Sequence, residues 1–199
     1  EAVRWYRKAA DQGNASAQLL LGICYDNGRG VLEDDKEAVK WFRMAADQGY
    51  AEGQFILGMC YAAGVGVLKD DREAVKWYRK AANQGLADAQ FKLGFCYATG
   101  DGVLKDNKEA ARWYRKAADQ GHADAQAYLG MHYSNGWGIP EDRVEGYAWY
   151  SLAAFHGSTK AASLKSELSK EMPPEQIAQG QQRSKELLKE IEEKQKRAK

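Results

Sequence analysis

The chain lacks any apolar run of about 18 residues, the length that crosses a membrane. It also lacks a charge imbalance, because 29 Lys and Arg stand against 28 Asp and Glu, so its overall charge gives no reason to expect nucleic acid. No signal-like segment is present, but the chain starts at Glu1 in the middle of a repeated pattern. We therefore expect a fragment, and the sequence leaves the compartment open.

Cysteine is scarce, with three residues spaced 36 apart: Cys24, Cys60 and Cys96. Packed helices lie about 8–10 Å apart, whereas a disulfide needs Cα atoms within about 7 Å. We therefore predict three buried, unpaired thiols. His132 takes the next place in this series, and four residues in single file, one to a repeat, cannot converge on one zinc ion at about 2.0–2.3 Å. No metal site is predicted.

Motifs of common catalytic sites are missing as well. The sequence has no Gly-x-Ser-x-Gly elbow and none of the S-x-x-K, S-D-N and K-T-G motifs. Its Gly-x-Gly turns follow predicted helices rather than strands and lack the third glycine of a dinucleotide site. We therefore predict no enzymatic activity and no cofactor.

What the chain does have is an internal repeat of 36 residues. Leu-Gly pairs, a tyrosine, a Gly-x-Gly turn and an aspartate recur in one register. Self-similarity at a period between about 20 and 50 residues indicates a solenoid, in which each unit buries its apolar face against its neighbours. The pattern W-x₈-G marks the period at Trp5, Trp41, Trp77, Trp113 and Trp149.

Each repeat reads as two antiparallel helices without a strand. In one of them Asp34 and Glu37 form a D-x-x-E capping box. Ala38, Trp41 and Phe42 begin the apolar face of this helix, and Gly49 ends the helix. The other helix is predicted from about Ala51 to Ala63. Its predicted buried positions are Gln54, Leu57, Gly58 and Tyr61, and the glycine allows close approach of the facing helix. The expected fold class is all-α, a right-handed α-α superhelix.

The array degenerates towards its end. We expect a solenoid over residues 1–171, with a partial repeat at 1–14, full repeats at about 15–48, 51–84, 87–120 and 123–156, and a degenerate helix at 158–171. After Pro173-Pro174 the residues 172–199 are expected to form a charged capping helix with Ile177, Leu187, Leu188 and Ile191 facing inward. Polar, irregular terminal units are what a solenoid needs to close its open end.

The string from Ala15-x-Ala17-Gln18 through Leu21-Gly22, Tyr25, Gly28-x-Gly30-Val31, Asp34, Glu37-Ala38 and Trp41-Phe42 to Gly49 closely resembles the Sel1-like repeat. This family is related to the tetratricopeptide repeat, and the resemblance covers residues 1 to about 168. Met172-Pro173-Pro174-Glu175 is similar to a segment of bacterial members. In the family convention the Leu-Gly-Tyr helix is helix A and the Trp helix is helix B. The resemblance implies a protein-binding adaptor and no reaction.

In related superhelices helix A lines the concave surface, so its variable positions are the candidate partner site. Apolar side chains recur there, and acidic residues stand at the helix starts. Such a groove suits an amphipathic helix or an extended peptide, and its acidic edge favours a basic partner; the alternative is that these side chains are core. The predicted site residues are Leu19, Ile23, Glu52, Phe55, Met59, Asp88, Phe91, Phe95, Asp124 and Met131.

The sequence leaves two alternative functions open. Basic residues of helix B could track phosphates, but Glu37, Glu73 and Glu109 precede Lys40, Lys76 and Arg112 by three, and Asp11, Asp47 and Asp119 follow Arg7, Arg43 and Arg115 by four. Paired charges on a solvated face explain this pattern better. Some cysteine-rich relatives are associated with β-lactam binding or hydrolysis, but they carry paired cysteines in each repeat, and this chain has at most one.

The first helix has no helix A before it, which leaves Trp5, Tyr6 and Ala9 without a cover. A homodimer through this helix is therefore a further prediction. The sequence does not identify the partner.

Overall fold

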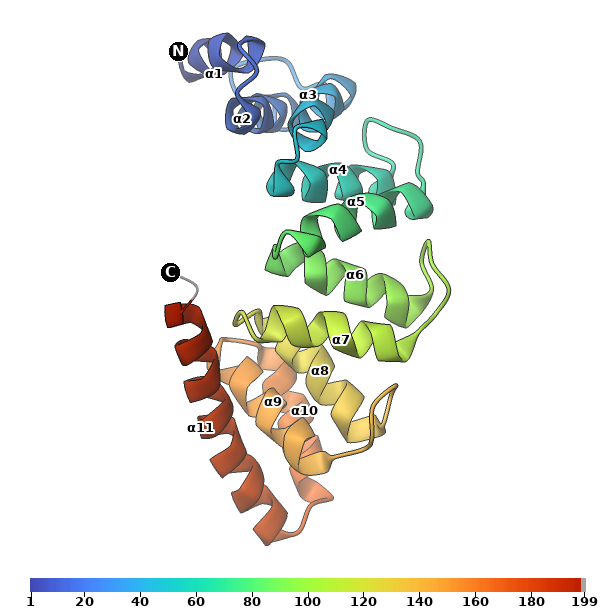
Figure 1. Ribbon diagram of the computed structural model, residues 1–199, viewed down its shortest axis with the longest axis vertical. Coiled ribbons are helices and arrows are strands. Elements are labelled where there is room, and N and C mark those ends of the chain that lie inside the picture. Colours follow the sequence, from blue (N-terminus) through green and yellow to red (C-terminus); the bar gives the residue numbers. More distant parts are fainter. Residues whose placement is uncertain (198–199) are drawn as a thin grey trace. The chain divides into compact units, whose positions relative to one another are not determined.

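The computed structural model describes residues 1–197, and no strand occurs in that range (Figure 1). The all-α class is confirmed. The helices are α1 (Ala2–Asp11), α2 (Ala15–Asp26), α3 (Asp35–Asp47), α4 (Ala51–Ala63), α5 (Asp71–Asn83), α6 (Ala87–Thr99), α7 (Asn107–Ala118), α8 (Ala123–Asn135), α9 (Arg143–Phe155), α10 (Thr159–Lys170) and α11 (Pro174–Arg197).

The chain divides into two compact units. Unit 1 comprises Glu1–Ala89 together with Asp101–Leu104, and unit 2 comprises Gln90–Gly100 and the chain from Lys105 onward. Helices α2, α4, α6 and α8 are the predicted A helices, and α1, α3, α5, α7 and α9 are the predicted B helices. The predicted span of Ala51 to Ala63 is the span observed for α4.

Aspartates begin α3, α5, α7 and α9 as predicted, but the capping box of α3 is only half formed. The Asp34 carboxylate accepts a hydrogen bond from the Glu37 N–H at 3.0 Å. The predicted return bond from Glu37 is wrong: the Asp34 N–H donates to the Tyr25 carbonyl at 3.0 Å, and Glu37 instead binds Lys40 at 2.6 Å. A carbonyl from the preceding A helix therefore satisfies the backbone donor, which ties the loop to both helices.

The core of unit 1 forms between consecutive helices. Leu21 and Leu57 are fully buried, and α4 packs against both α3 and α5. A Cβ added at Gly58 would lie 2.7 Å from the Tyr78 ring. The predicted close approach at this glycine is confirmed, and an alanine there would collide with an aromatic ring of the core.

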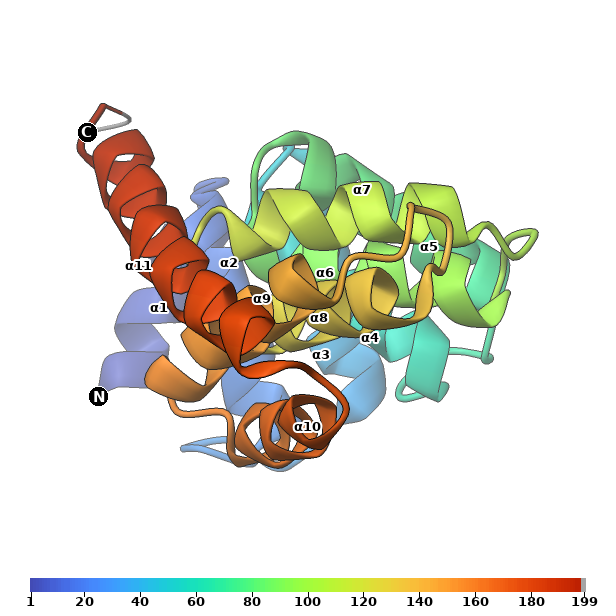
Figure 2. The ribbon, with the colours of Figure 1, turned by 90° about the horizontal axis from the view of Figure 1, so that it is seen from below.

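The core of unit 2 is closed by two helices outside the regular pattern. Helix α10 packs on α9 through Ala161, and α11 lies along α9 (Figures 1 and 2). Leu187 and Ile191 of α11 join the same buried cluster as Trp149. The prediction that these two side chains face inward is confirmed.

Candidate functional site

The predicted site residues of unit 1 lie at different depths. Leu19 is 8% exposed and belongs to the buried cluster that includes Phe42 and Ala45. Ile23 and Phe55 are half-buried, and the Phe55 ring packs 5.9 Å from the ring of Tyr78. Met59 is 38% exposed. The structure therefore places Leu19 in the core and leaves Met59 at the surface.

Sequence reasoning missed Leu20, which is 37% exposed. Each residue turns an α-helix by about 100°, so Leu20 points away from the core in which Leu19 lies and shares an outward face with Ile23. Its counterpart Ile56 on α4 is half-buried, and α2 and α4 contact each other. We call Leu20, Ile23, Ile56 and Met59 the A-helix patch of unit 1. A helical-wheel register centred on the constant Leu-Gly-Tyr face would have found it.

In unit 2 the predicted aromatic residues Phe91 and Phe95 belong to a packed cluster of rings. Phe91 lies 5.5 Å from Tyr128, 5.8 Å from Tyr114 and 4.8 Å from His122, measured between ring centroids. Phe95 meets Tyr128 edge to face at 6.2 Å. Tyr114 is fully buried, and Phe91, Phe95 and Tyr128 are half-buried, so these rings pack the repeat between α6, α7 and α8.

Met131 is half-buried and its exposure is limited by α10. It packs against the cluster of Ala127, Tyr150 and Ala161, together with Leu164 and Leu168 of α10. The degenerate helix therefore takes up the apolar surface that Met131 offers.

The three predicted acidic residues lie in the first turns of A helices. Glu52 begins α4, Asp88 begins α6 and Asp124 begins α8, and all three are exposed. A carboxylate in the first turn is favoured by the helix dipole by about 0.3–1 kcal/mol, which gives these residues a structural role apart from any ligand.

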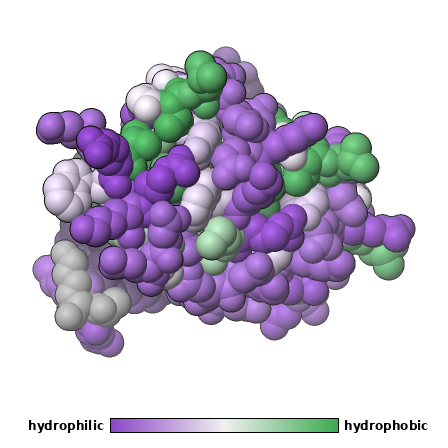
Figure 3. All heavy atoms as spheres, turned by 90° about the horizontal axis from the view of Figure 1, so that it is seen from above, coloured by the Kyte–Doolittle hydropathy of each residue, from purple (hydrophilic) through white to green (hydrophobic). Residues whose placement is uncertain are grey.

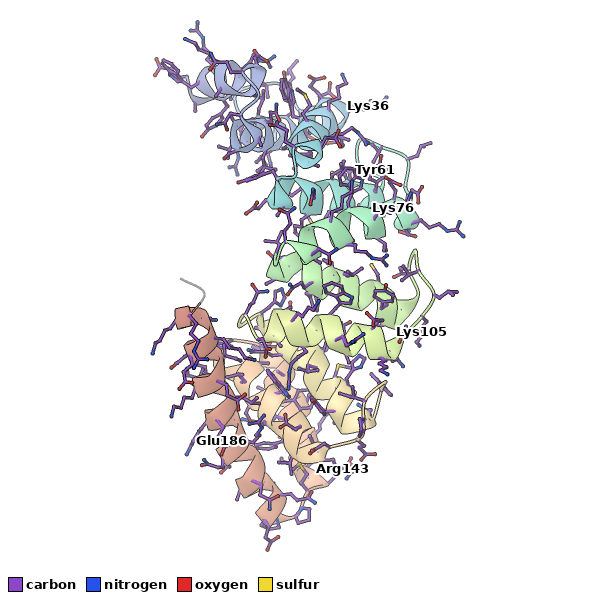
Figure 4. All side chains as sticks on the ribbon, viewed as in Figure 1. Lys36, Tyr61, Lys76, Lys105, Arg143 and Glu186 are labelled. Carbon is purple, nitrogen blue, oxygen red and sulfur yellow. The ribbon has the colours of Figure 1, made fainter. Side chains whose placement is uncertain are left out.

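The basic residues of helix B have partners that the sequence predicted only in part. Lys76 (Figure 4) is exposed and binds Glu73 at 2.7 Å, and Arg112 binds Glu109 at 2.7 Å. Arg7 and Arg43, which we expected to pair with aspartates, donate to the hydroxyls of Tyr25 and Tyr61 instead. A bond from helix B to helix A thus replaces a bond along one helix.

An unpredicted row of leucines occupies the loops that follow the Gly-x-Gly turns of unit 1. Leu32, Leu68 and Leu104 are 90%, 91% and 92% exposed. Because they contact almost nothing, they have no packing role in the repeat. Figure 3 shows separate apolar patches on an otherwise hydrophilic face, and these leucines are the most exposed apolar side chains of unit 1.

The first helix packs through one face only. Tyr6 and Ala9 lie against the cluster of Ala10, Ala17 and Leu21, whereas Trp5 is 69% exposed. The prediction that Trp5 is not packed against a neighbouring helix is confirmed. The same prediction for Tyr6 and Ala9 is confirmed only in part, because both are half-buried.

Cys24, Cys60 and Cys96 are buried, as predicted, and within residues 1–197 they form no disulfide. Burial raises the pKa of the Cys60 thiol to about 11, with smaller contributions from Asp26 and Asp35, so this thiol stays protonated at neutral pH. Burial lowers the pKa of His132, against a raising effect of its hydrogen bond to the Trp137 carbonyl. Within residues 1–197 no group of His, Cys, Asp or Glu side chains could hold a metal ion, and no helix is long and apolar enough to cross a membrane.

The Sel1 repeat family model matches residues 1–14, 15–50, 51–86, 87–122 and 123–158. These segments agree with the pairing of A and B helices in the structure. No curated protein matches the chain.

Several solved structures are similar over most of the chain, two of them at more than 35% identity. A protective antigen of uropathogenic Escherichia coli with an SLR fold is 36% identical, with a TM-score of 0.87, over 95% of this chain and 41% of that protein. A Sel1 repeat protein of Oxalobacter formigenes is 37% identical, with a TM-score of 0.78, over 88% of this chain and 74% of that protein. The Helicobacter pylori cysteine-rich protein B, at 22% identity and a TM-score of 0.53, shares the fold over 66% of this chain. The repeat matches and the helix pairs together show that this chain belongs to the Sel1 repeat family.

Proposed function

We propose that this chain is a non-catalytic scaffold that binds a peptide or protein segment along its A helices. Sel1 repeat proteins are in general protein-interaction scaffolds. The observation that supports a site on the A helices is the contrast within unit 1 between buried Leu21 and Leu57 and exposed Leu20 and Met59. The first pair maintains the repeat, whereas the second pair presents apolar surface that the repeat does not use.

The chemistry of the A-helix patch favours an apolar segment with a basic neighbour. Leu20, Ile23, Ile56 and Met59 offer aliphatic and thioether surface that adapts to different side chains. The exposed carboxylate of Glu52 lies one turn before Ile56 on the same face of α4, where it attracts a Lys or Arg beside the apolar contact.

Site-specific photo-crosslinking distinguishes the A-helix patch from the leucine loops. A benzoylphenylalanine is placed at position 59, at position 32 or at position 76, which lies on an exposed face of helix B. We expect a discrete crosslinked partner in the source cells from position 59 and none from position 76. Crosslinks from position 32 alone would transfer the binding surface to the loops of Leu32, Leu68 and Leu104.

The crosslinked partner is then bound to two matched double variants. Leu20→Asn with Met59→Asn should weaken binding at least tenfold, and Leu32→Asn with Leu68→Asn should leave it within twofold. Each variant removes two exposed apolar side chains, so a general loss of surface hydrophobicity affects both. Equal losses would contradict a site on the A helices.

The alternatives predict other outcomes. Binding of duplex or single-stranded nucleic acid with a steep salt dependence would favour the basic face of helix B. Nitrocefin turnover that a single substitution abolishes would overturn the non-catalytic assignment. Concentration-dependent association that Trp5→Ser abolishes would support the predicted homodimer.

A further inference from the structure

Unit 2 contains a cavity of about 370 Å³ between α7, α8 and the loop after α8. Arg112, Arg115 and Lys116 line it from α7, and Tyr133 lines it from α8. Leu129 and Ile139 form an apolar wall. Ligand pockets begin at about 300 Å³, so the cavity has room for one or two amino-acid side chains.

Two polar groups at this cavity lack the bond that their counterparts form in unit 1. There Arg7 donates to Tyr25, and Arg43 donates to Tyr61. The equivalent pair in unit 2 is Arg115 and Tyr133. Arg115 Nη1 is buried without a hydrogen-bond partner, and among the described residues the Tyr133 hydroxyl has none. The bond that would close this cavity is therefore not formed.

The guanidinium of Arg115 lies against α9 instead. Its Cζ stands 4.9 Å from the centroid of the Trp149 ring. The indole Nε1 of Trp149 donates to Glu145 at 3.0 Å, and Glu145 accepts a second bond, at 2.5 Å, from Arg183 of α11. The aromatic platform under Arg115 is thus fixed by the C-terminal helix.

Acidic neighbours neutralise these cations incompletely. The nearest carboxylate, Asp119, is 3.9 Å from Arg115 Nε and binds Lys194 of α11 at the shorter distance of 2.8 Å. The Lys116 ammonium lies 3.9 Å from the centroid of the Trp113 ring, and it has no ion pair within residues 1–197. Only Arg112 has a close carboxylate, that of Glu109 at 2.7 Å.

We propose that this cavity binds the carboxylate of a peptide, with an apolar side chain against Leu129 and Ile139. A buried N–H without an acceptor is unfavourable, and a carboxylate in the cavity would accept from the Arg115 guanidinium, the Lys116 ammonium and the Tyr133 hydroxyl together. Charge-assisted bonds of this kind are about twice as strong as neutral ones. The site is independent of the A-helix patch and has the opposite charge preference.

Three small probes, followed by NMR of labelled whole chain, test the carboxylate. Acetyl-Leu-Glu-amide carries a side-chain carboxylate, acetyl-leucine a terminal one, and acetyl-Leu-Gln-amide carries none. We expect saturable shifts at Arg115 and Tyr133 with at least one carboxylate probe, and a dissociation constant at least tenfold lower than for the glutamine probe. The stronger carboxylate probe tells a side chain from a chain terminus. Equal binding of all three would overturn the proposal, as would inorganic phosphate binding more tightly than either carboxylate.

Matched variants test the position of the site. Lys116→Gln should weaken carboxylate binding at least fivefold, and Tyr133→Phe at least threefold. Lys80 lies 3.7 Å from the Trp77 ring centroid and is the equivalent of Lys116 one repeat earlier in unit 1, outside the lining of this cavity, so Lys80→Gln should change binding less than twofold. If Tyr133→Phe fails to fold, the two lysine variants decide the matter. Equal effects of Lys116→Gln and Lys80→Gln would overturn the proposal.

Discussion

The side-chain amide of Gln84 donates to the side-chain oxygen of Gln54 at 2.8 Å, across 30 residues of sequence. Gln54 is buried, and its own amide donates to the Ala46 carbonyl at 3.1 Å. Gln48 and Gln18 form the same bond at 2.6 Å. Each pair links the ends of two successive B helices through the A helix between them, so the buried glutamines hold the register between repeats.

This relationship predicts a dependence between two substitutions. Gln84→Ala leaves the buried Gln54 oxygen without its partner and should cost about 1–3 kcal/mol. In a Gln54→Met background, where no oxygen remains to be satisfied, the cost of Gln84→Ala should fall by at least about 0.5 kcal/mol. Urea unfolding of the four chains measures the coupling.

The control for this cycle is Gln12→Ala. Gln12 is exposed at the equivalent position, and within the described residues its side chain forms no hydrogen bond. Its replacement should change the free energy of unfolding by less than about 0.5 kcal/mol. Additive effects of the Gln54 and Gln84 substitutions would show that the glutamine pair contributes nothing to the coupling of repeats.

The burial of His132 predicts that the free energy of unfolding falls in acid. His132 occupies the buried position that Cys24, Cys60 and Cys96 hold in the other repeats, and burial lowers its pKa below the usual 6.5. The unfolded chain therefore binds a proton before the folded chain does. The stabilising contribution is present above pH 6.5 and is lost as the pH falls towards the folded-state pKa, by up to about 1.4 kcal/mol per pH unit.

The matched variant is His132→Cys, which restores the residue of the other repeats. The free energy of unfolding, measured in urea between pH 8 and pH 5, should fall more steeply with acidification for the original chain than for the variant. The difference between the two slopes isolates His132 from the other titrating groups. Parallel pH profiles would show that His132 has the same pKa in both states.

The unpaired hydroxyl of Tyr114 predicts that a substitution supplying a hydrogen-bond partner increases stability. This hydroxyl is buried without a hydrogen-bond partner, whereas the hydroxyl of Tyr150, 36 residues later, lies 3.2 Å from Ser134 Oγ. Position 98 corresponds to Ser134 and holds an alanine in the same buried surroundings as Tyr114. Ala98→Ser should therefore supply the missing partner and raise the free energy of unfolding by about 1 kcal/mol.

A Tyr114→Phe background provides the control for this gain. Phe42 already occupies the equivalent position in an earlier repeat, so the phenylalanine fits the fold. In that background Ala98→Ser should be neutral or destabilising, because its hydroxyl has no phenol to bind. The same gain with and without the Tyr114 hydroxyl would refute the predicted bond.

Local features of the sequence predicted the helices well, because caps and stops depend on neighbouring residues. Asp34 caps the start of α3, and Gly49 with its positive φ follows the end of that helix. Each of them acts on the adjacent helical turn, so the local sequence is enough to predict its role. The bonds of Arg43 to Tyr61 and of Gln84 to Gln54 join residues 18 and 30 apart. They depend on how helices pack, which a single sequence does not fix.

The A-helix patch that we propose has Leu20 where the sequence predicted Leu19, a difference of one residue of helix rotation. Leu19 and Leu20 are both apolar, and only packing shows that the first is buried and the second exposed. Leu32 was missed for a related reason, since a leucine beside a repeated Gly-x-Gly turn gives no signal that its side chain faces solvent. Hydrophobicity alone therefore does not separate core from surface in a repeat rich in apolar residues.

The contact of α11 with α9 predicts a strong coupling between Arg183 and Glu145. The two side chains meet at 2.5 Å and are 27% and 19% exposed, and Glu145 also accepts the Trp149 indole N–H. Removing one partner of a mostly buried ion pair leaves an uncompensated charge, so Arg183→Met should cost about 2–4 kcal/mol. Glu186 (Figure 4) and Glu190, which also lie within ion-pair distance of Arg183, lose a partner as well.

A double-mutant cycle of Arg183→Met with Glu145→Gln should give a coupling energy above about 1 kcal/mol. The control is Lys185→Met at an exposed position, which should couple to Glu145→Gln by less than about 0.3 kcal/mol. Glu145 and Arg183 also hold the Trp149 ring under Arg115, so Arg183→Met should reduce carboxylate binding in the cavity lined by Arg115 and Tyr133. Unchanged binding would show that the cavity does not depend on the packing of α11.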